Sequence, residues 1–287
     1  MDAAILHALE KIRCPFLDVF FGIFTALGEE MIIAAIIAVV YICFSKRTGE
    51  QALLTVMTAS GITAGVKSAV RRLRPYAAGT VSRVEIDNPF VSTVDLDADM
   101  SFPSGHATAS SGFFATVSIR RRRALVITLC SLFTLLVMLS RLYFGVHYPT
   151  DVLTGLLIGV GCAFFWQLIY SKWYGARLYI YAAAALLSVP LLFIPRTATD
   201  SMFQISAILL ATAAGLLIED RFIRFEDTKN WLHRLFRLLL AGACAAVPFL
   251  VFHFALPDGQ WMDFITYFFT LFAAVTLAPF LFKKLKI

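Results

Sequence analysis

The chain has 287 residues, of which 59% are hydrophobic and only 15% are charged, and its formal net charge is +6 at pH 7. A soluble domain carries about 25% charged residues, so this composition excludes an ordinary soluble protein. The predicted fold class is all-α: a polytopic transmembrane helical bundle built from apolar runs long enough to span a bilayer.

The N-terminal segment differs from the rest because its apolar run is short. Residues 2–12 are amphipathic, and the apolar run over 15–28 is followed by Glu29 and Glu30. We expect these two segments to form an interfacial or re-entrant hairpin packed on the bundle. A full span over 15–28 is the alternative, and it would move the N-terminus across the membrane.

Nine apolar runs follow, each with about the length that a transmembrane helix needs. They cover residues 31–45, 51–70, 104–119, 124–143, 151–171, 178–195, 203–218, 237–256 and 262–282. The first five runs and the N-terminal hairpin make up a predicted core over residues 1–172. The last four make up a predicted transmembrane extension over residues 173–287, which carries no motif of its own.

Three short motifs lie at the ends of the second to fifth runs. Their patterns are K-x6-R-P, P-S-G-H and S-R-x5-H-x3-D, in that order along the chain. Their residues are Lys67, Arg74, Pro75, Pro103, Ser104, Gly105, His106, Ser140, Arg141, His147 and Asp151. If the runs alternate in direction, four helix ends meet on one side of the membrane, so we expect these residues to share one interfacial pocket.

The motif residues are those that metal-free cleavage of a phosphate ester needs, namely cations, a nucleophile and an acid for the leaving oxygen. Lys67, Arg74 and Arg141 can supply the cations. His106 and His147 are the two motif histidines. Asp151 follows His147 by one helical turn if the segment is helical, where it can fix the imidazole tautomer.

Ser104 and Gly105 have the character of a helix start that binds an anion. Ser104 is a suitable N-cap, which leaves the backbone N–H groups of Gly105 and His106 free for a phosphate. Gly105 also allows a close approach of the backbone. The neighbouring Arg71 and Arg72 are explained by interfacial snorkelling and are assigned no role.

In this order and at these spacings, the motifs resemble the type 2 phosphatidic acid phosphatase (PAP2) family, over roughly residues 50 to 170. The resemblance implies a metal-independent membrane lipid phosphatase, without a cofactor, that hydrolyses a lipid phosphate monoester or pyrophosphate through a phosphohistidine. It implies His147 as the nucleophile, Asp151 as its orienting partner and His106 as the general acid. It also implies a set of phosphate-binding residues, namely Lys67, Arg74, Ser104, Gly105 and Arg141.

Three alternatives stay open. A lipid phosphotransferase would use the same intermediate and pass the phosphate to another acceptor. A vanadium haloperoxidase shares the signature, although the embedded site and the lack of a large soluble domain disfavour it. A nonenzymatic lipid transporter or scaffold is suggested by the four additional C-terminal runs.

The distribution of basic residues predicts the orientation in the membrane. One set of alternate connections holds 16 of the 25 Lys and Arg residues, and five of the other nine lie in the motif region. The positive-inside rule therefore puts the motifs on the extracytoplasmic face, in a bacterium that of the inner membrane. Because this bias accounts for the net charge, membrane lipids and a lipid phosphate are the expected partners, and nucleic acid is not.

Two further expectations concern the connection over 76–102 and the cysteines. The connection carries several acidic residues and is expected to form a solvated lid or substrate gate over the site. The five cysteines show no C-x-x-C or zinc spacing, so they are expected to be buried free thiols.

Overall fold

A computed structural model describes residues 2–82, 100–195 and 197–287. Within these ranges the chain is helical and forms no strand. Most of the predicted lid, residues 83–99, lies outside the described residues. The helices are α1 (Asp2–Glu10), α2 (Pro15–Leu27), α3 (Glu30–Val39), η1 (Val40–Phe44), α4 (Lys46–Val70), α5 (Gly105–Arg121), α6 (Ala124–Tyr143), α7 (Pro149–Lys172), η2 (Tyr174–Ala176), α8 (Arg177–Leu186), η3 (Val189–Phe193), α9 (Asp200–Ile218), η4 (Glu219–Ile223), α10 (Trp231–Ala255) and α11 (Gln260–Leu285).

Seven helical segments of the described chain are long and apolar enough to cross a membrane. They are α4, α6, α7, α8 with its flanking η2 and η3, α9 with η4, α10, and α11. The pair formed by α2 and by α3 with η1 passes the same test together but is bent by 55°, as in a broken span or a re-entrant loop. The all-α polytopic bundle with four additional C-terminal transmembrane helices is thereby confirmed.

Two of the nine expected spans differ from the prediction. The run over 31–45 forms α3 and η1, which are one arm of the bent pair. The run over 104–119 forms α5, which has 17 residues and is not among the candidate spans. α5 is thus short for a span, and it packs on α4, α6 and α7, where its hydroxyl side chains are buried and hydrogen-bonded; Thr116, for example, donates to the Gly112 carbonyl at 2.8 Å.

The contact between α5 and α7 is close because glycine lies at the crossing. A Cβ atom added at Gly159 of α7 would lie 2.5 Å from the Thr108 carbonyl oxygen of α5. At the same end of the bundle, the Ser104 N–H donates to the Asp151 carbonyl at 3.1 Å. Together these contacts hold the first turns of α5 and α7 side by side, which positions two of the three motifs.

The N-terminal segment is fastened to the motif end of the bundle. The Glu10 carboxylate accepts a hydrogen bond from the Ser82 N–H at 2.8 Å, and Arg13 Nη1 donates to the Ser82 carbonyl at 2.8 Å. Cys14, between α1 and α2, is exposed, so the prediction of buried thiols was wrong for this residue. It lies in a connection and not in an apolar helix; the other four cysteines are free and buried as predicted.

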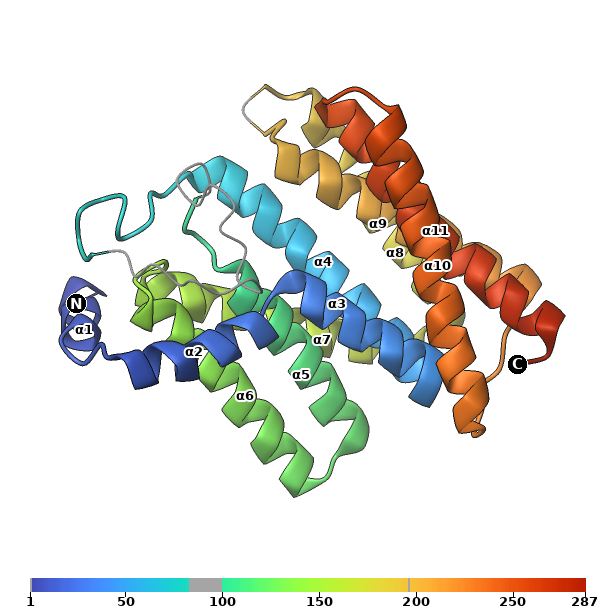
Figure 1. Cartoon of the computed structure of the whole chain (residues 1–287), viewed down its shortest axis with the longest axis horizontal. Helices are drawn as coiled ribbons and strands as arrows, with labels where there is room; N and C mark the ends of the chain where they lie inside the picture. The colour runs from blue at the N-terminus through green and yellow to red at the C-terminus, as the bar shows by residue number, and fades with distance from the viewer. Residues whose placement is uncertain (1, 83–99, 196) are drawn as a thin grey trace.

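The C-terminal helices α8 to α11 lie on one side of α4, and α5 and α6 lie on the other (Figure 1). The contact with α4 and α7 is apolar in its centre, where Leu54, Trp166 and Leu216 are fully buried. Ion pairs join the two parts at the end of α4 remote from the motifs: Arg177 Nε with Glu50 at 2.5 Å, and Lys46 with Glu219 at 2.7 Å. A division of the chain into functional units at residues 172 and 173 stays a prediction.

Candidate active site

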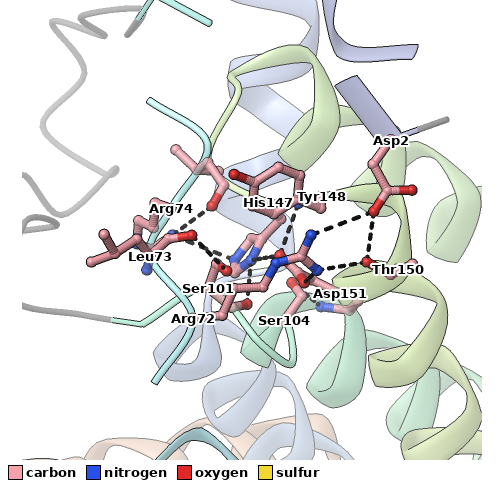
Figure 2. A network of polar contacts seen from close by, with 12 residues as sticks. Asp2, Arg72, Leu73, Arg74, Ser101, Ser104, His147, Tyr148, Thr150 and Asp151 are labelled. Carbon is pink, nitrogen blue, oxygen red and sulfur yellow. Dashed lines mark hydrogen bonds and ion pairs between the residues drawn. The ribbon is translucent and has the colours of Figure 1, made fainter. Parts of the chain in front are cut away.

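His147 lies where the three motifs meet, in the connection between α6 and α7 (Figure 2). Its Nδ1 lies 2.7 Å from the Ser101 carbonyl oxygen, and its Nε2 lies 3.5 Å from Arg74 Nη1. A carbonyl oxygen can only accept a hydrogen bond, so Nδ1 carries the proton. In the neutral ring the lone pair is then on Nε2, beside the guanidinium group of Arg74.

The surroundings of His147 keep its ring neutral. The residue is 2% exposed, and burial together with the nearby Arg74, Arg141 and Lys67 lowers the pKa of His147 well below its usual value. A neutral imidazole retains the nucleophilic lone pair that a protonated ring has lost. The same cations that suit phosphoryl oxygens therefore also keep the candidate nucleophile unprotonated.

Asp151 lies in the first turn of α7 and is fully buried. Its Oδ2 accepts a hydrogen bond from the Tyr148 N–H at 2.8 Å and lies 3.6 Å from His147 Nδ1. Its Oδ1 accepts a bond from Arg72 Nη1 at 2.9 Å. The carboxylate is thus near the ring of His147, as the spacing predicted, but the nearest acceptor for Nδ1 is the carbonyl of Ser101.

The predicted phosphate-binding cations reach the pocket from three elements. Arg74 is 3% exposed and follows α4, where its Nη1 donates to the Val146 carbonyl at 3.1 Å. Arg141 is 5% exposed and lies in the last turn of α6, where its Nη1 donates to the hydroxyl of Thr25. Lys67 lies in the last turn of α4. Their positions match a pocket for an anion, with two guanidinium groups held by fixed acceptors.

The N-terminus of α5 forms another wall. Ser104 is the N-cap of this helix, as predicted, and its hydroxyl accepts a hydrogen bond from the Ala107 N–H at 3.4 Å. Gly105 is the first helical residue, and a Cβ there would lie 2.5 Å from a carboxylate oxygen of Glu30. His106 follows, and its Nε2 lies 3.0 Å from the carboxylate of Glu29.

Four side chains or backbone groups of the site have no signal in the motifs: Thr25, Glu29, Arg72 and the Ser101 carbonyl. Glu29 was noted only as the end of a short apolar run, and Arg72 was explained by snorkelling. In the structure the Arg72 guanidinium instead stacks on the Tyr148 ring at 3.7 Å while it contacts Asp151. Among the described residues, no group of three or more His, Cys, Asp or Glu side chains is arranged to hold a metal ion.

Comparisons with known proteins match two parts of the chain. The family model of the PAP2 superfamily matches residues 50–175, and that of the PAP2 superfamily phosphatase transmembrane extension matches residues 203–287. Lipid A 4'-phosphatase of Bacteroides thetaiotaomicron is 30% identical over 55% of this chain and 72% of its own length. Phosphatidylglycerophosphatase B of Bacillus subtilis is 24% identical over 55% of this chain and 78% of its own. A putative undecaprenyl-diphosphatase of Escherichia coli is 28% identical over 52% and 74%.

Proposed function

Because this chain belongs to the PAP2 superfamily and is a membrane phosphatase of that superfamily, we propose that it hydrolyses a lipid phosphate or pyrophosphate through a phosphohistidine formed on His147. The observation that carries the proposal is the hydrogen bond from His147 Nδ1 to the Ser101 carbonyl. This bond leaves the Nε2 lone pair available within a pocket that holds Lys67, Arg74 and Arg141.

The first step of the proposed reaction is attack of His147 Nε2 on phosphorus. The bond from phosphorus to the leaving oxygen breaks, and His106 gives its proton to that oxygen, so the lipid departs as a neutral alcohol. Lys67, Arg74 and Arg141 stabilise the negative charge on the other phosphoryl oxygens, with the N–H groups at the start of α5. Asp151 stabilises the positive charge that forms on the ring of His147.

The second step regenerates the enzyme. His106, which is now neutral, accepts a proton from water, and the resulting oxygen nucleophile attacks the phosphohistidine. The bond between nitrogen and phosphorus breaks, which releases inorganic phosphate and returns His147 to its starting state. A transferase would replace this water with another hydroxyl, so the dependence of phosphate release on an added acceptor distinguishes the two reactions.

The proposed substrate class follows from the relatives, which are named for phosphatidylglycerophosphate, an undecaprenyl diphosphate and lipid A. These lipids share an anionic phosphate at the membrane surface and differ in everything attached to it. The cations around His147 fit the shared part. We therefore propose a lipid phosphate at the extracytoplasmic face of a bacterial inner membrane, where the positive-inside rule puts the motifs.

Replacement of His147 tests this proposal. His147→Ala should abolish phosphate release, because no other group of the site can form the intermediate, while the protein still purifies as a folded species. His106→Ala should lose about 100-fold or more on an alkyl phosphate such as phosphatidic acid, and far less on p-nitrophenyl phosphate, whose leaving group needs little protonation. Turnover by His147→Ala close to the wild-type rate would contradict the assignment of the nucleophile.

A further inference from the structure

The bend between α2 and α3 contributes side chains to three sides of the candidate site. Thr25, one turn before the bend, accepts a hydrogen bond from Arg141. Glu30, at the start of α3, places a carboxylate oxygen against Gly105. Glu29, at the bend itself, lies 3.0 Å from His106 Nε2. The predicted interfacial or re-entrant hairpin and the two glutamates that follow it therefore contact the candidate site.

From this geometry we propose that Glu29 is the positioning residue for the general acid His106. A contact of 3.0 Å between a carboxylate oxygen and a ring nitrogen is the length of a charge-assisted hydrogen bond, and it fixes which nitrogen is engaged. Because Glu29 engages Nε2, the nitrogen that serves the leaving oxygen is Nδ1. This inference rests on the proposed function, in which His106 protonates that oxygen.

The electrostatics of the pocket explain why an acid at this place needs such a partner. Burial and the nearby Arg141 and Arg74 lower the pKa of His106 to about 4, and the Glu29 carboxylate opposes that shift. An imidazole that has lost its proton cannot serve as an acid. A carboxylate in contact with the ring favours the protonated form, and it does so without reaching the phosphoryl group.

The proton balance of the reaction is consistent with this role. In the first step the imidazolium of His106 donates its Nδ1 proton to the leaving oxygen and keeps the Nε2 proton on Glu29. The neutral ring then has its lone pair on Nδ1, which accepts a proton from the attacking water in the second step. His147 and His106 are in this respect a matched pair, since each is held through one nitrogen and reacts through the other.

The experiment compares Glu29→Gln with the wild type on two substrates. This substitution keeps the shape of the side chain and removes its charge. On phosphatidic acid in detergent micelles, kcat/KM should fall by about 10- to 100-fold, because protonation of a poor leaving group is impaired. On p-nitrophenyl phosphate the loss should stay within about threefold. Glu29→Asp, which retains the carboxylate, should recover part of the loss on phosphatidic acid.

Glu30→Gln is the matched control, since it removes a neighbouring carboxylate that lies against Gly105. Any change in its activity should be the same on both substrates. The double variant His106→Ala/Glu29→Gln should be no slower on phosphatidic acid than His106→Ala alone, because Glu29 acts only through His106. Melting temperature and gel filtration establish that the variants remain folded.

Three results would overturn the inference. Equal losses for Glu29→Gln on the two substrates would indicate a structural role. A lower KM with unchanged kcat would indicate that Glu29 merely competes with substrate for the pocket. Full additivity in the double variant would show that Glu29 acts independently of His106. If His106→Ala loses the same activity on both substrates, the general-acid role of His106 in the proposed function has failed as well. If His106→Ala loses more on phosphatidic acid and Glu29→Gln does not, only the positioning role of Glu29 fails.

Discussion

Asp151 is a single carboxylate that Tyr148, His147, Ser101 and Arg72 all contact, and its role depends on how they share it. The backbone of Tyr148 and the ring of His147 lie at Oδ2, whereas Arg72 supplies a charged donor at Oδ1. The Arg72 side chain is held in turn by the Tyr148 ring and by the Thr150 hydroxyl at 2.7 Å. Burial disfavours the ionised form of Asp151, and Arg72, together with the Tyr148 N–H, opposes that effect and orients the carboxylate.

Removal of this guanidinium should impair catalysis at a distance. Arg72→Gln takes away a hydrogen bond between charged groups, which is worth about 1.5–3 kcal/mol. If that stabilisation acts in the transition state, kcat should fall by roughly 10- to 100-fold on every substrate, since the nucleophile and not the acid is affected. Asp2→Asn is the control: Asp2 contacts Arg72 at 3.5 Å but not Asp151, so its effect on kcat should be small. Wild-type kcat in Arg72→Gln would leave snorkelling as the better explanation.

The side chains around the phosphate should also make the reaction independent of a metal. Two buried guanidinium groups, Lys67 and a helix N-terminus supply the positive charge that a divalent cation provides in other phosphatases. Activity is expected to persist in excess EDTA, and orthovanadate is expected to inhibit as an analogue of the pentacoordinate transition state. Activity that EDTA removes and magnesium or zinc restores would contradict this prediction.

At the scale of elements, the site depends on how closely α5 and α7 approach. The Gly159 position allows the backbones to touch, and the first turns of the two helices carry Ser104 and Asp151. A larger residue at the crossing must push the helices apart, because two of the three nearest atoms, the Thr108 carbonyl oxygen and the Gly112 nitrogen, belong to the backbone of α5 and cannot rotate away.

Gly159→Val should therefore destabilise the protein by at least about 1–3 kcal/mol and lower its activity through the displaced first turns. Gly161→Val, two residues along the same helix, is the matched control, because a Cβ there would meet nothing within 4 Å. The measurements are the melting temperature in detergent and the rate of phosphate release for both variants. Similar melting temperatures for the two variants would show that the helices can separate without cost.

The same elements show how far the sequence could predict the structure. Apolar runs predicted most of the helices, because length and hydropathy decide membrane insertion locally. The predicted placement of His147 near Asp151 followed from a spacing of four residues. Glu29 and Arg72 could not be assigned in this way, since their partners lie on other segments. The bend after α2 and the packing of α5 decide those contacts, and neither leaves a periodic pattern in the sequence.

At the scale of the whole molecule, α4 separates two charged regions. Lys67 lies near one end of α4 and Lys46 at the other, and a helix of 25 residues is roughly 37 Å long. The Lys46 end collects basic residues from several connections, where Lys46 pairs with Glu219 and Lys283 donates to the Ile223 carbonyl. The structure thus places at the Lys46 end of α4 some of the basic residues on which the predicted orientation depends.

Cysteine labelling can test this orientation with little change to the protein. Cys14 is the exposed native cysteine, and it lies at the motif end, where its N–H contacts the Tyr143 hydroxyl. If the motifs face outward, a membrane-impermeant maleimide should label the wild type in intact cells or spheroplasts, and Cys14→Ser should remove that signal. In a Cys14→Ser background, Ser171→Cys at the exposed end of α7 should react only after lysis. The reverse pattern would overturn the proposed membrane face, and with it the leaflet in which substrate is presented, but it would leave the chemistry at His147 unaffected.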